Sequence, residues 1–98
     1  MITRLVKLTL QPEKAEEFKD IFYQTKPLIE DFPGCEKTDL FEVAGGESQY
    51  FTISYWQSEE DLEKYRASAL FEQTWRKVKP LFSAKAEAFT LNAVASAE

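Results

Sequence analysis

The residues that could build a binding site are concentrated between Tyr50 and Trp75. This run contains both tryptophans of the protein, Trp56 and Trp75, together with the hydroxyl groups of Thr52 and Tyr65. Large aromatic rings can line a flat slot for an aromatic ligand, and hydroxyl groups can orient or protonate the oxygens of that ligand. The same rings can also simply fill the core of a small domain, and for large aromatic side chains this is the more common use.

Histidine is absent from all 98 residues, and its absence restricts the chemistry. No Ser-His-Asp or Cys-His nucleophile system can form, and histidine cannot hold zinc or haem iron. Acid–base work near pH 7 would fall to a carboxylate, lysine or tyrosine with a shifted pKa, or to the substrate itself. Glu59, Glu60 and Asp61 follow Ser58 at the start of a predicted helix, so we interpret them as a solvated helix cap. We therefore predict no metal site and no cofactor.

Two other residues have more than one interpretation. Arg4 lies on the apolar face of the first predicted strand, where a charge needs a partner. A salt bridge at the end of the strand is the favoured interpretation, and anion binding is the alternative. Cys35 follows the turn residue Gly34 at the start of a strand, where a free thiol is expected to serve packing rather than nucleophilic attack.

Composition and charge exclude several classes of partner. The chain is 44% hydrophobic and 30% charged, as in a globular domain, and its net charge of −5 disfavours binding to nucleic acid. No stretch of about 18 apolar residues is present, so no membrane span is predicted. The N-terminal residues do not resemble a signal peptide, and the single cysteine suits a reducing compartment. We expect a cytoplasmic protein with one domain over residues 1–98.

Hydrophobic periodicity predicts an alternation of strands and helices. The predicted elements are a strand over Ile2–Leu10, a helix over 13–32, strands over Cys35–Val43 and Tyr50–Trp56, two helices that begin near Ser58 and Ser68, and a strand over Ala86–Val94. Pro27 interrupts the first helical stripe, so we expect a break near Thr25 to Lys26. Pro80 is expected to loosen the end of the last helix.

This order is the split β-α-β, ferredoxin-like pattern of the α+β class, with a four-stranded antiparallel sheet and helices on one face. Alternation within Tyr50–Trp56 places bulky or aromatic side chains on both faces of that strand. The face without helices needs a cover, and a second copy of the chain could supply it. We therefore predict a homodimer.

Three segments together resemble the antibiotic biosynthesis monooxygenase (ABM) family. They are FPGC at residues 32–35, YWQSEE at residues 55–60 and YRASALF at residues 65–71, and they occur in the family's order across nearly the whole chain. The resemblance implies a dimeric alpha/beta barrel with a cleft in each subunit between sheet and helices. It also implies one of several activities: cofactor-free oxidation of quinols by dioxygen, haem breakdown, or isomerisation of small oxygenated metabolites.

The resemblance also suggests roles for individual residues. Trp56 stands where quinol oxidisers and haem degraders place a cleft tryptophan, and Thr52 stands where a quinol oxidiser would carry an asparagine. The iron-binding histidine of haem degraders falls at Trp75, and their first-strand asparagine falls at Val6, so haem oxygenation is not expected. Another histidine of the family falls at Leu70, which removes the obvious base for an isomerase.

Two hypotheses follow. The first is a cofactor-independent monooxygenase that acts on an aromatic quinol or polyphenol. The second is a non-catalytic dimeric module, either ligand-binding or stress-associated, that uses the same cleft for a small aromatic or apolar ligand. The residues predicted to contribute to catalysis are Trp56, Thr52 and Tyr65. The residues predicted to bind the substrate are Arg4, Val6, Phe22, Leu70, Phe71 and Trp75.

Overall fold

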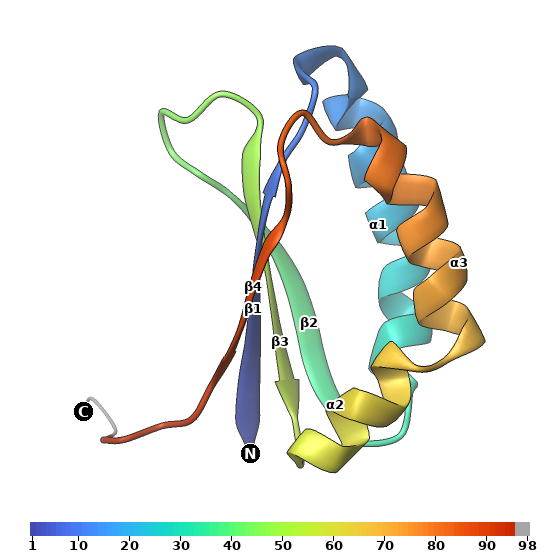
Figure 1. Cartoon of the computed structure of the whole chain (residues 1–98), viewed down its shortest axis with the longest axis vertical. Coiled ribbons are helices and arrows are strands. Elements are labelled where there is room, and N and C mark those ends of the chain that lie inside the picture. The colour runs from blue at the N-terminus through green and yellow to red at the C-terminus, as the bar shows by residue number, and fades with distance from the viewer. Residues whose placement is uncertain (96–98) are drawn as a thin grey trace.

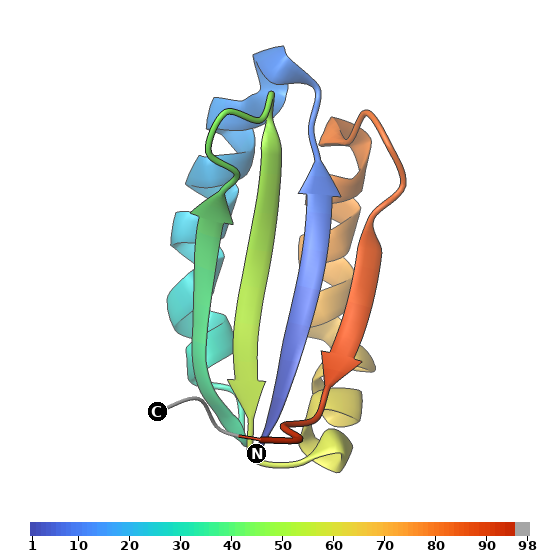
Figure 2. The same ribbon diagram turned by 90° about the vertical axis from the view of Figure 1, so that its left-hand side faces the viewer.

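The computed structural model describes residues 1–95 of the chain as one antiparallel sheet covered by helices. The elements are β1 (Ile2–Thr9), η1 (Pro12–Lys14), α1 (Ala15–Glu30), β2 (Cys35–Glu42), β3 (Gln49–Trp56), α2 (Glu59–Arg66), α3 (Ala69–Val78), η2 (Lys79–Leu81) and β4 (Glu87–Leu91). The four strands run in the order β2-β3-β1-β4. All helices lie on one side of the sheet (Figure 1), and the other side is left open (Figure 2). The predicted α+β, ferredoxin-like architecture is confirmed.

The predicted break at Pro27 is wrong, because α1 continues through it to Glu30. Pro27 is exposed, and so is Tyr23, whose carbonyl would have accepted the missing hydrogen bond. The carbonyl of Tyr23 that is left without this hydrogen bond therefore lies on the solvent side of the helix. Burial of Ile29 holds the last turn against the sheet, and a hydrogen bond of 2.7 Å from Lys26 Nζ to the carbonyl of Thr38 adds to it.

The predicted helix starts at Ser58 and Ser68 are confirmed, whereas α1 is shorter at both ends than the predicted helix over 13–32. The hydroxyl oxygen of Ser58 accepts from the backbone N–H of Asp61 at 3.1 Å, and that of Ser68 accepts from Phe71 at 3.2 Å. These bonds satisfy backbone donors that an isolated helix start leaves unpaired. Pro80 ends the regular α-helix, and the chain tightens into η2.

The register of β1 against β3 determines which side chains face the helices. Arg4 pairs with Ser54, Val6 with Thr52, and Leu8 with Tyr50. Paired residues project to the same face of a sheet, so these side chains all point toward α1 and α3. The period-two prediction for both strands is confirmed, including the inward position of the charged Arg4.

The core beneath the helices is divided into two clusters. One is formed by Leu8, Leu10, Phe18, Tyr50, Val78 and Leu81, and the other by Ile2, Ile29, Trp56 and Leu62. They lie toward opposite ends of β1 and β3. The space between them is not completely filled by side chains.

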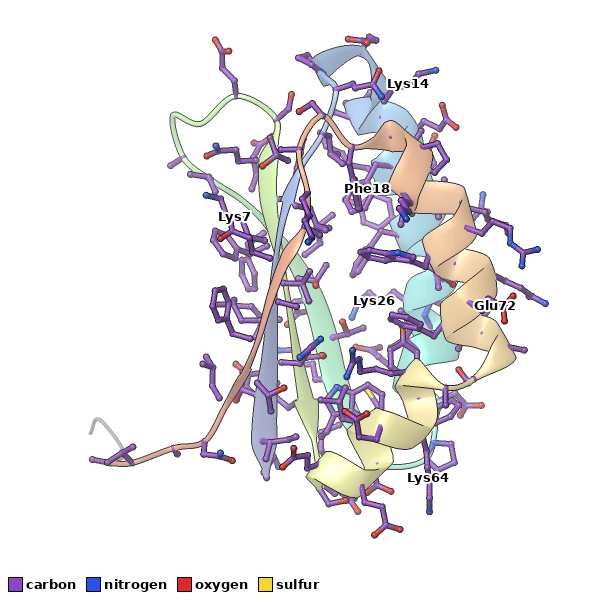
Figure 3. The ribbon with its side chains drawn as sticks, in the orientation of Figure 1. Lys7, Lys14, Phe18, Lys26, Lys64 and Glu72 are labelled. Carbon is purple, nitrogen blue, oxygen red and sulfur yellow. The ribbon has the colours of Figure 1, made fainter. Side chains whose placement is uncertain are left out.

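The open face of the sheet carries exposed apolar side chains. Phe89 is 50% exposed, Leu91 44% and Phe41 51%. Lys7 projects from this face, away from Phe18 on the helix side (Figure 3). The strand that carries Phe89, β4, is shorter than the predicted Ala86–Val94, because β1 pairs with it only from Glu87 to Leu91. Within residues 1–95, no helix is long and apolar enough to cross a membrane.

Candidate active site

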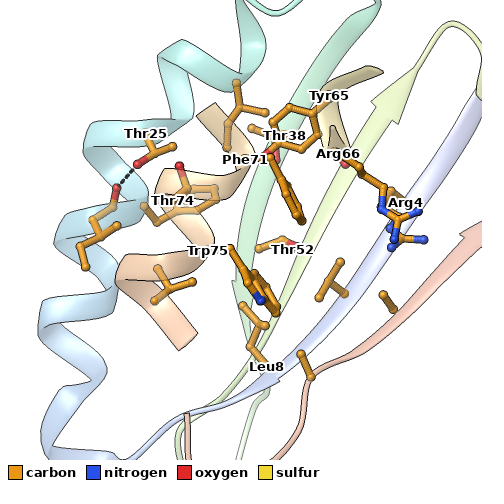
Figure 4. A pocket seen from close by; sticks show the side chains of 18 of the residues that line it. Arg4, Leu8, Thr25, Thr38, Thr52, Tyr65, Arg66, Phe71, Thr74 and Trp75 are labelled. Atoms are coloured by element: carbon orange, nitrogen blue, oxygen red, sulfur yellow. Dashed lines mark hydrogen bonds between the residues drawn. The ribbon is translucent and has the colours of Figure 1, made fainter. Parts of the chain in front are cut away.

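A cavity of about 390 Å³ lies between the sheet and the helices, where the two core clusters leave space. Its volume falls within the range of small-ligand sites. Leu8 and Phe18 from one cluster and Ile29 and Leu62 from the other contribute to its wall. Figure 4 shows side chains from the sheet and from the helices projecting into this space.

Most of the predicted site residues line this cavity. From the sheet these are Arg4, Val6 and Thr52, and from the helices they are Phe22, Tyr65, Phe71 and Trp75. The two remaining predicted residues, Trp56 and Leu70, are not part of the lining. The structure thus brings together side chains from five elements, although their roles toward a ligand stay predictions.

Trp56 was expected in the wall of the cleft but is completely buried beneath it, with 0% exposure. Its indole N–H donates to the hydroxyl oxygen of Ser54 at 2.9 Å, and its ring stacks on Tyr65 at a centroid distance of 5.0 Å. Ser54 and Tyr65 both line the cavity. Any influence of Trp56 on a ligand therefore passes through these two neighbours.

Leu70 also packs into the core instead of facing the cavity, against the cluster that contains Ile2 and Trp56. Successive side chains on a helix are about 100° apart, so Leu70 and Phe71 point in different directions. Phe71 faces the cavity and Leu70 does not. The position at which the resemblance places a family histidine is thus occupied here by a packing residue.

Tyr65 lies among three aromatic rings, those of Trp56, Phe32 and Phe71. Burial raises the pKa of its phenol to about 12, because the phenolate would lose its hydration. At neutral pH this group keeps its proton. Tyr65 can therefore donate a hydrogen bond or a proton into the cavity, but it is not a base.

Stacked aromatic rings form one wall. The centroids of Phe71 and Trp75 are 5.9 Å apart and their planes differ by only 8°. Trp75 in turn contacts Phe82 edge-on at 5.5 Å. Rings held in this way lose little freedom when a flat ligand binds, which favours recognition of an aromatic molecule.

Arg4 is the charged residue that the sheet contributes. Its Nη1 donates to the hydroxyl oxygen of Thr90 on β4 at 2.8 Å. Burial lowers the pKa of Arg4, and the positive charge of Arg66 lowers it further, whereas Glu63 acts in the opposite direction. The favoured interpretation of Arg4, a salt bridge at the end of the strand, is wrong. Among residues 1–95, Arg4 makes no ion pair and donates a hydrogen bond to a neutral hydroxyl group instead.

Sequence reasoning missed several lining residues, including Ser54, Arg66 and Thr74. The alternation of β3 already placed Ser54 on the same face as Thr52, so its position had a usable signal. Arg66 ends α2, and its approach to the cavity depends on how that short helix sits over the sheet. No periodicity in the sequence indicates that placement.

The Cys35 thiol and a metal ion are two other sources of reactivity, and neither contributes to this cavity among the described residues. Burial raises the pKa of the Cys35 thiol, which keeps it protonated beside the cluster that contains Trp56. Within residues 1–95, no three potential metal ligands of the histidine, cysteine, aspartate or glutamate type come together. The chemistry available in the cavity is therefore that of hydroxyl groups, one protonated phenol and two guanidinium groups.

Comparison with known proteins supports the architecture. A structure of Rv0793 from Mycobacterium tuberculosis matches with a TM-score of 0.88 and 15% identity, covering 99% of this chain and 98% of that chain. A Caulobacter crescentus protein, described as a candidate antibiotic biosynthesis monooxygenase, matches with a TM-score of 0.89 and 23% identity over 96% and 90% of the two chains. These similarities establish a common fold.

A third similar structure is that of a mutant of SnoaB, a cofactor-independent oxygenase from Streptomyces nogalater. It matches with a TM-score of 0.84 and 18% identity over 97% of this chain and 94% of that one. No curated protein matches the chain by sequence. The family model "Antibiotic biosynthesis monooxygenase" matches residues 1–77, which include β1 to β3 and most of the helices around the cavity. The chain belongs to the antibiotic biosynthesis monooxygenase family.

Proposed function

We propose that this protein is a cofactor-independent monooxygenase that oxidises an electron-rich aromatic molecule, a quinol or polyphenol, in the cavity between sheet and helices. The observation that carries the proposal is the mainly apolar cavity, in which the parallel rings of Phe71 and Trp75 and several hydroxyl groups line the wall. The fold that it shares with a protein named a cofactor-independent oxygenase supports the proposal. Family membership supports it at the level of the reaction type.

The chemistry in such a site would come from the substrate. A phenolate ring transfers one electron to dioxygen, and the resulting phenoxyl radical and superoxide combine to form a carbon–oxygen bond. Protonation gives a ring hydroperoxide, which loses water and leaves a quinone. One atom of dioxygen enters the ring and the other leaves as water, so the substrate supplies all the electrons. A site that excludes water protects these intermediates from side reactions.

The residues of the cavity can assist each part of this reaction. Phe71 and Trp75 would hold the ring, and Thr52 would bind one of its oxygens from the sheet. Tyr65 keeps its proton at neutral pH and would donate it toward the developing peroxide. Trp56 would act as a positioning residue, because it orients Ser54 and supports the Tyr65 ring.

The cavity offers no side chain that is a base near pH 7 among its described lining residues. This observation favours substrates that ionise readily in water, and it also favours the second candidate function. In that alternative the protein binds an aromatic or apolar ligand in the same cavity without turnover.

Oxygen uptake with a hydroxylated naphthoquinol tests the proposal. The native protein is expected to exceed the rate of autoxidation, and Thr52→Val is expected to lower this excess rate about tenfold, as for the loss of a hydrogen bond of about 1.4 kcal/mol. Thr3→Val is the matched control, because Thr3 faces away from the helices. Native protein at the autoxidation rate would refute the oxygenase, and tryptophan quenching by the quinol without turnover would identify a binding protein.

A further inference from the structure

The charged residues of the cavity are unusual for this protein. The chain carries 17 acidic and 12 basic residues, yet the charged side chains among the described lining residues are Arg4 and Arg66, with no carboxylate. Figure 4 shows the two arginines together at one side of the cavity. They are close enough for the positive charge of Arg66 to lower the pKa of Arg4. An acidic protein thus presents two positive charges to whatever occupies this space.

The guanidinium of Arg4 is positioned by the sheet and remains available to a ligand. Ser54 on β3 and Thr90 on β4 pair with Arg4 in the register of the sheet. Thr90 accepts one bond of 2.8 Å from Nη1, and an arginine has five N–H donors. The hydroxyl oxygen of Ser54 already accepts from Trp56, so its own proton is left to donate beside Arg4.

Arg66 reaches the same place from the last turn of α2. It is partly neutralised by Glu63 one turn earlier, with a nitrogen–oxygen distance of 3.0 Å. This ion pair lies on the exposed side of α2, where such pairs contribute little free energy and are easily exchanged. Two guanidinium groups and one carboxylate leave a net positive charge at this side of the cavity.

We propose that Arg4 and Arg66 bind the carboxylate of an aromatic ligand whose ring lies against Phe71 and Trp75. The planar fork of a guanidinium matches the two oxygens of a carboxylate, and an anion relieves the repulsion between the two cations. A carboxylic acid is ionised at neutral pH, whereas a phenol is not, so a carboxylate needs no base in the cavity. The substrate class is therefore a hydroxylated aromatic acid. The hydroxylated ring rests on the proposed oxygenase function, but the binding of the carboxylate does not.

Calorimetric titration with 2-naphthoate and 2-naphthamide tests this site, because the two probes have the same ring and nearly the same shape. The naphthoate is expected to bind at least about tenfold more tightly to the native protein. Arg4→Gln and Arg66→Gln are each expected to weaken the binding of naphthoate about tenfold and to leave the binding of naphthamide unchanged. Arg76→Gln is the control, since Arg76 pairs with Glu72 on the surface of α3 and does not line this cavity.

Equal affinities for the two probes, or equal losses for both probes in the arginine variants, would overturn the carboxylate site. So would the absence of binding by either probe. Oxygen uptake separates this inference from the proposed function. Selective binding of naphthoate without turnover of any quinol supports the carboxylate site and refutes the oxygenase. Turnover of a quinol together with equal affinities for naphthoate and naphthamide supports the oxygenase and refutes the carboxylate site.

Discussion

Trp56 offers a sharp test of how the buried core supports the cavity. Trp56→Ala is unsuitable, because loss of a buried tryptophan costs about 3–5 kcal/mol and a whole domain is stabilised by only about 5–15 kcal/mol. Trp56→Phe keeps a ring near Tyr65 but removes the indole N–H that binds Ser54. The conservative variant therefore removes the hydrogen bond and keeps most of the burial.

The expected loss of stability follows from two contributions. Phenylalanine lacks two of the buried ring carbons of tryptophan, at about 0.8 kcal/mol each, and the hydrogen bond to Ser54 contributes about 1 kcal/mol. We expect Trp56→Phe to lower the free energy of unfolding by about 2.5 kcal/mol. For a domain of this size that loss corresponds to a decrease in Tm of roughly 10–20 °C.

Urea denaturation followed by circular dichroism measures this loss at one fixed protein concentration. Ser54→Ala completes a double-mutant cycle, in which the coupling between positions 54 and 56 should be about 1 kcal/mol. The reasoning fails if the two changes are additive within about 0.3 kcal/mol, since the hydrogen bond would then contribute nothing. A loss below about 1 kcal/mol for Trp56→Phe would contradict the buried position itself.

Three further predictions concern the turn, the edge of α1 and the open face. Gly34→Ala should lower the free energy of unfolding by more than about 1 kcal/mol and by more than the control Gly45→Ala. Both glycines have a positive φ, but only at Gly34 would a methyl group overlap another side chain. Equal losses for the two variants in urea denaturation would contradict this. A hydrogen bond from Lys26 and one from a backbone N–H of β2 lower the pKa of Glu30. The ionised Glu30 therefore stabilises the folded state by about 1 kcal/mol above its unfolded pKa of about 4.3, and this contribution is lost as the pH falls through the lower folded pKa. Glu30→Gln should remove this part of the pH dependence, and unchanged acid denaturation would contradict it. Light scattering is expected to show a homodimer, and Phe89→Glu on the exposed apolar face should shift it toward monomer; a native monomer at micromolar concentration would refute the dimer.

Local patterns in the sequence were sufficient to predict the elements and the faces of the central strands. Alternation in β1 and β3 placed Arg4, Val6 and Thr52 on one side of the sheet, because side chains of a strand alternate strictly. Ser58 and Ser68 marked two helix starts, because their hydroxyl groups satisfy backbone donors nearby in the chain. These features depend on neighbours a few residues away.

Features that depend on contacts between distant segments were decided only by the tertiary structure. Pro27 remains within a helix because the turn around it is held by the sheet and its missing hydrogen bond faces solvent. Trp56 is buried beneath the cavity because α2 and Tyr65 cover the end of its strand. Arg66 lies near Arg4 because two elements more than 50 residues apart in sequence meet at the cavity. The sequence by itself determined which side chains face inward. Only the packing of the helices on the sheet decided which of these side chains line the cavity and which are covered, because the shape of the cavity depends on the volumes of side chains from every element at once.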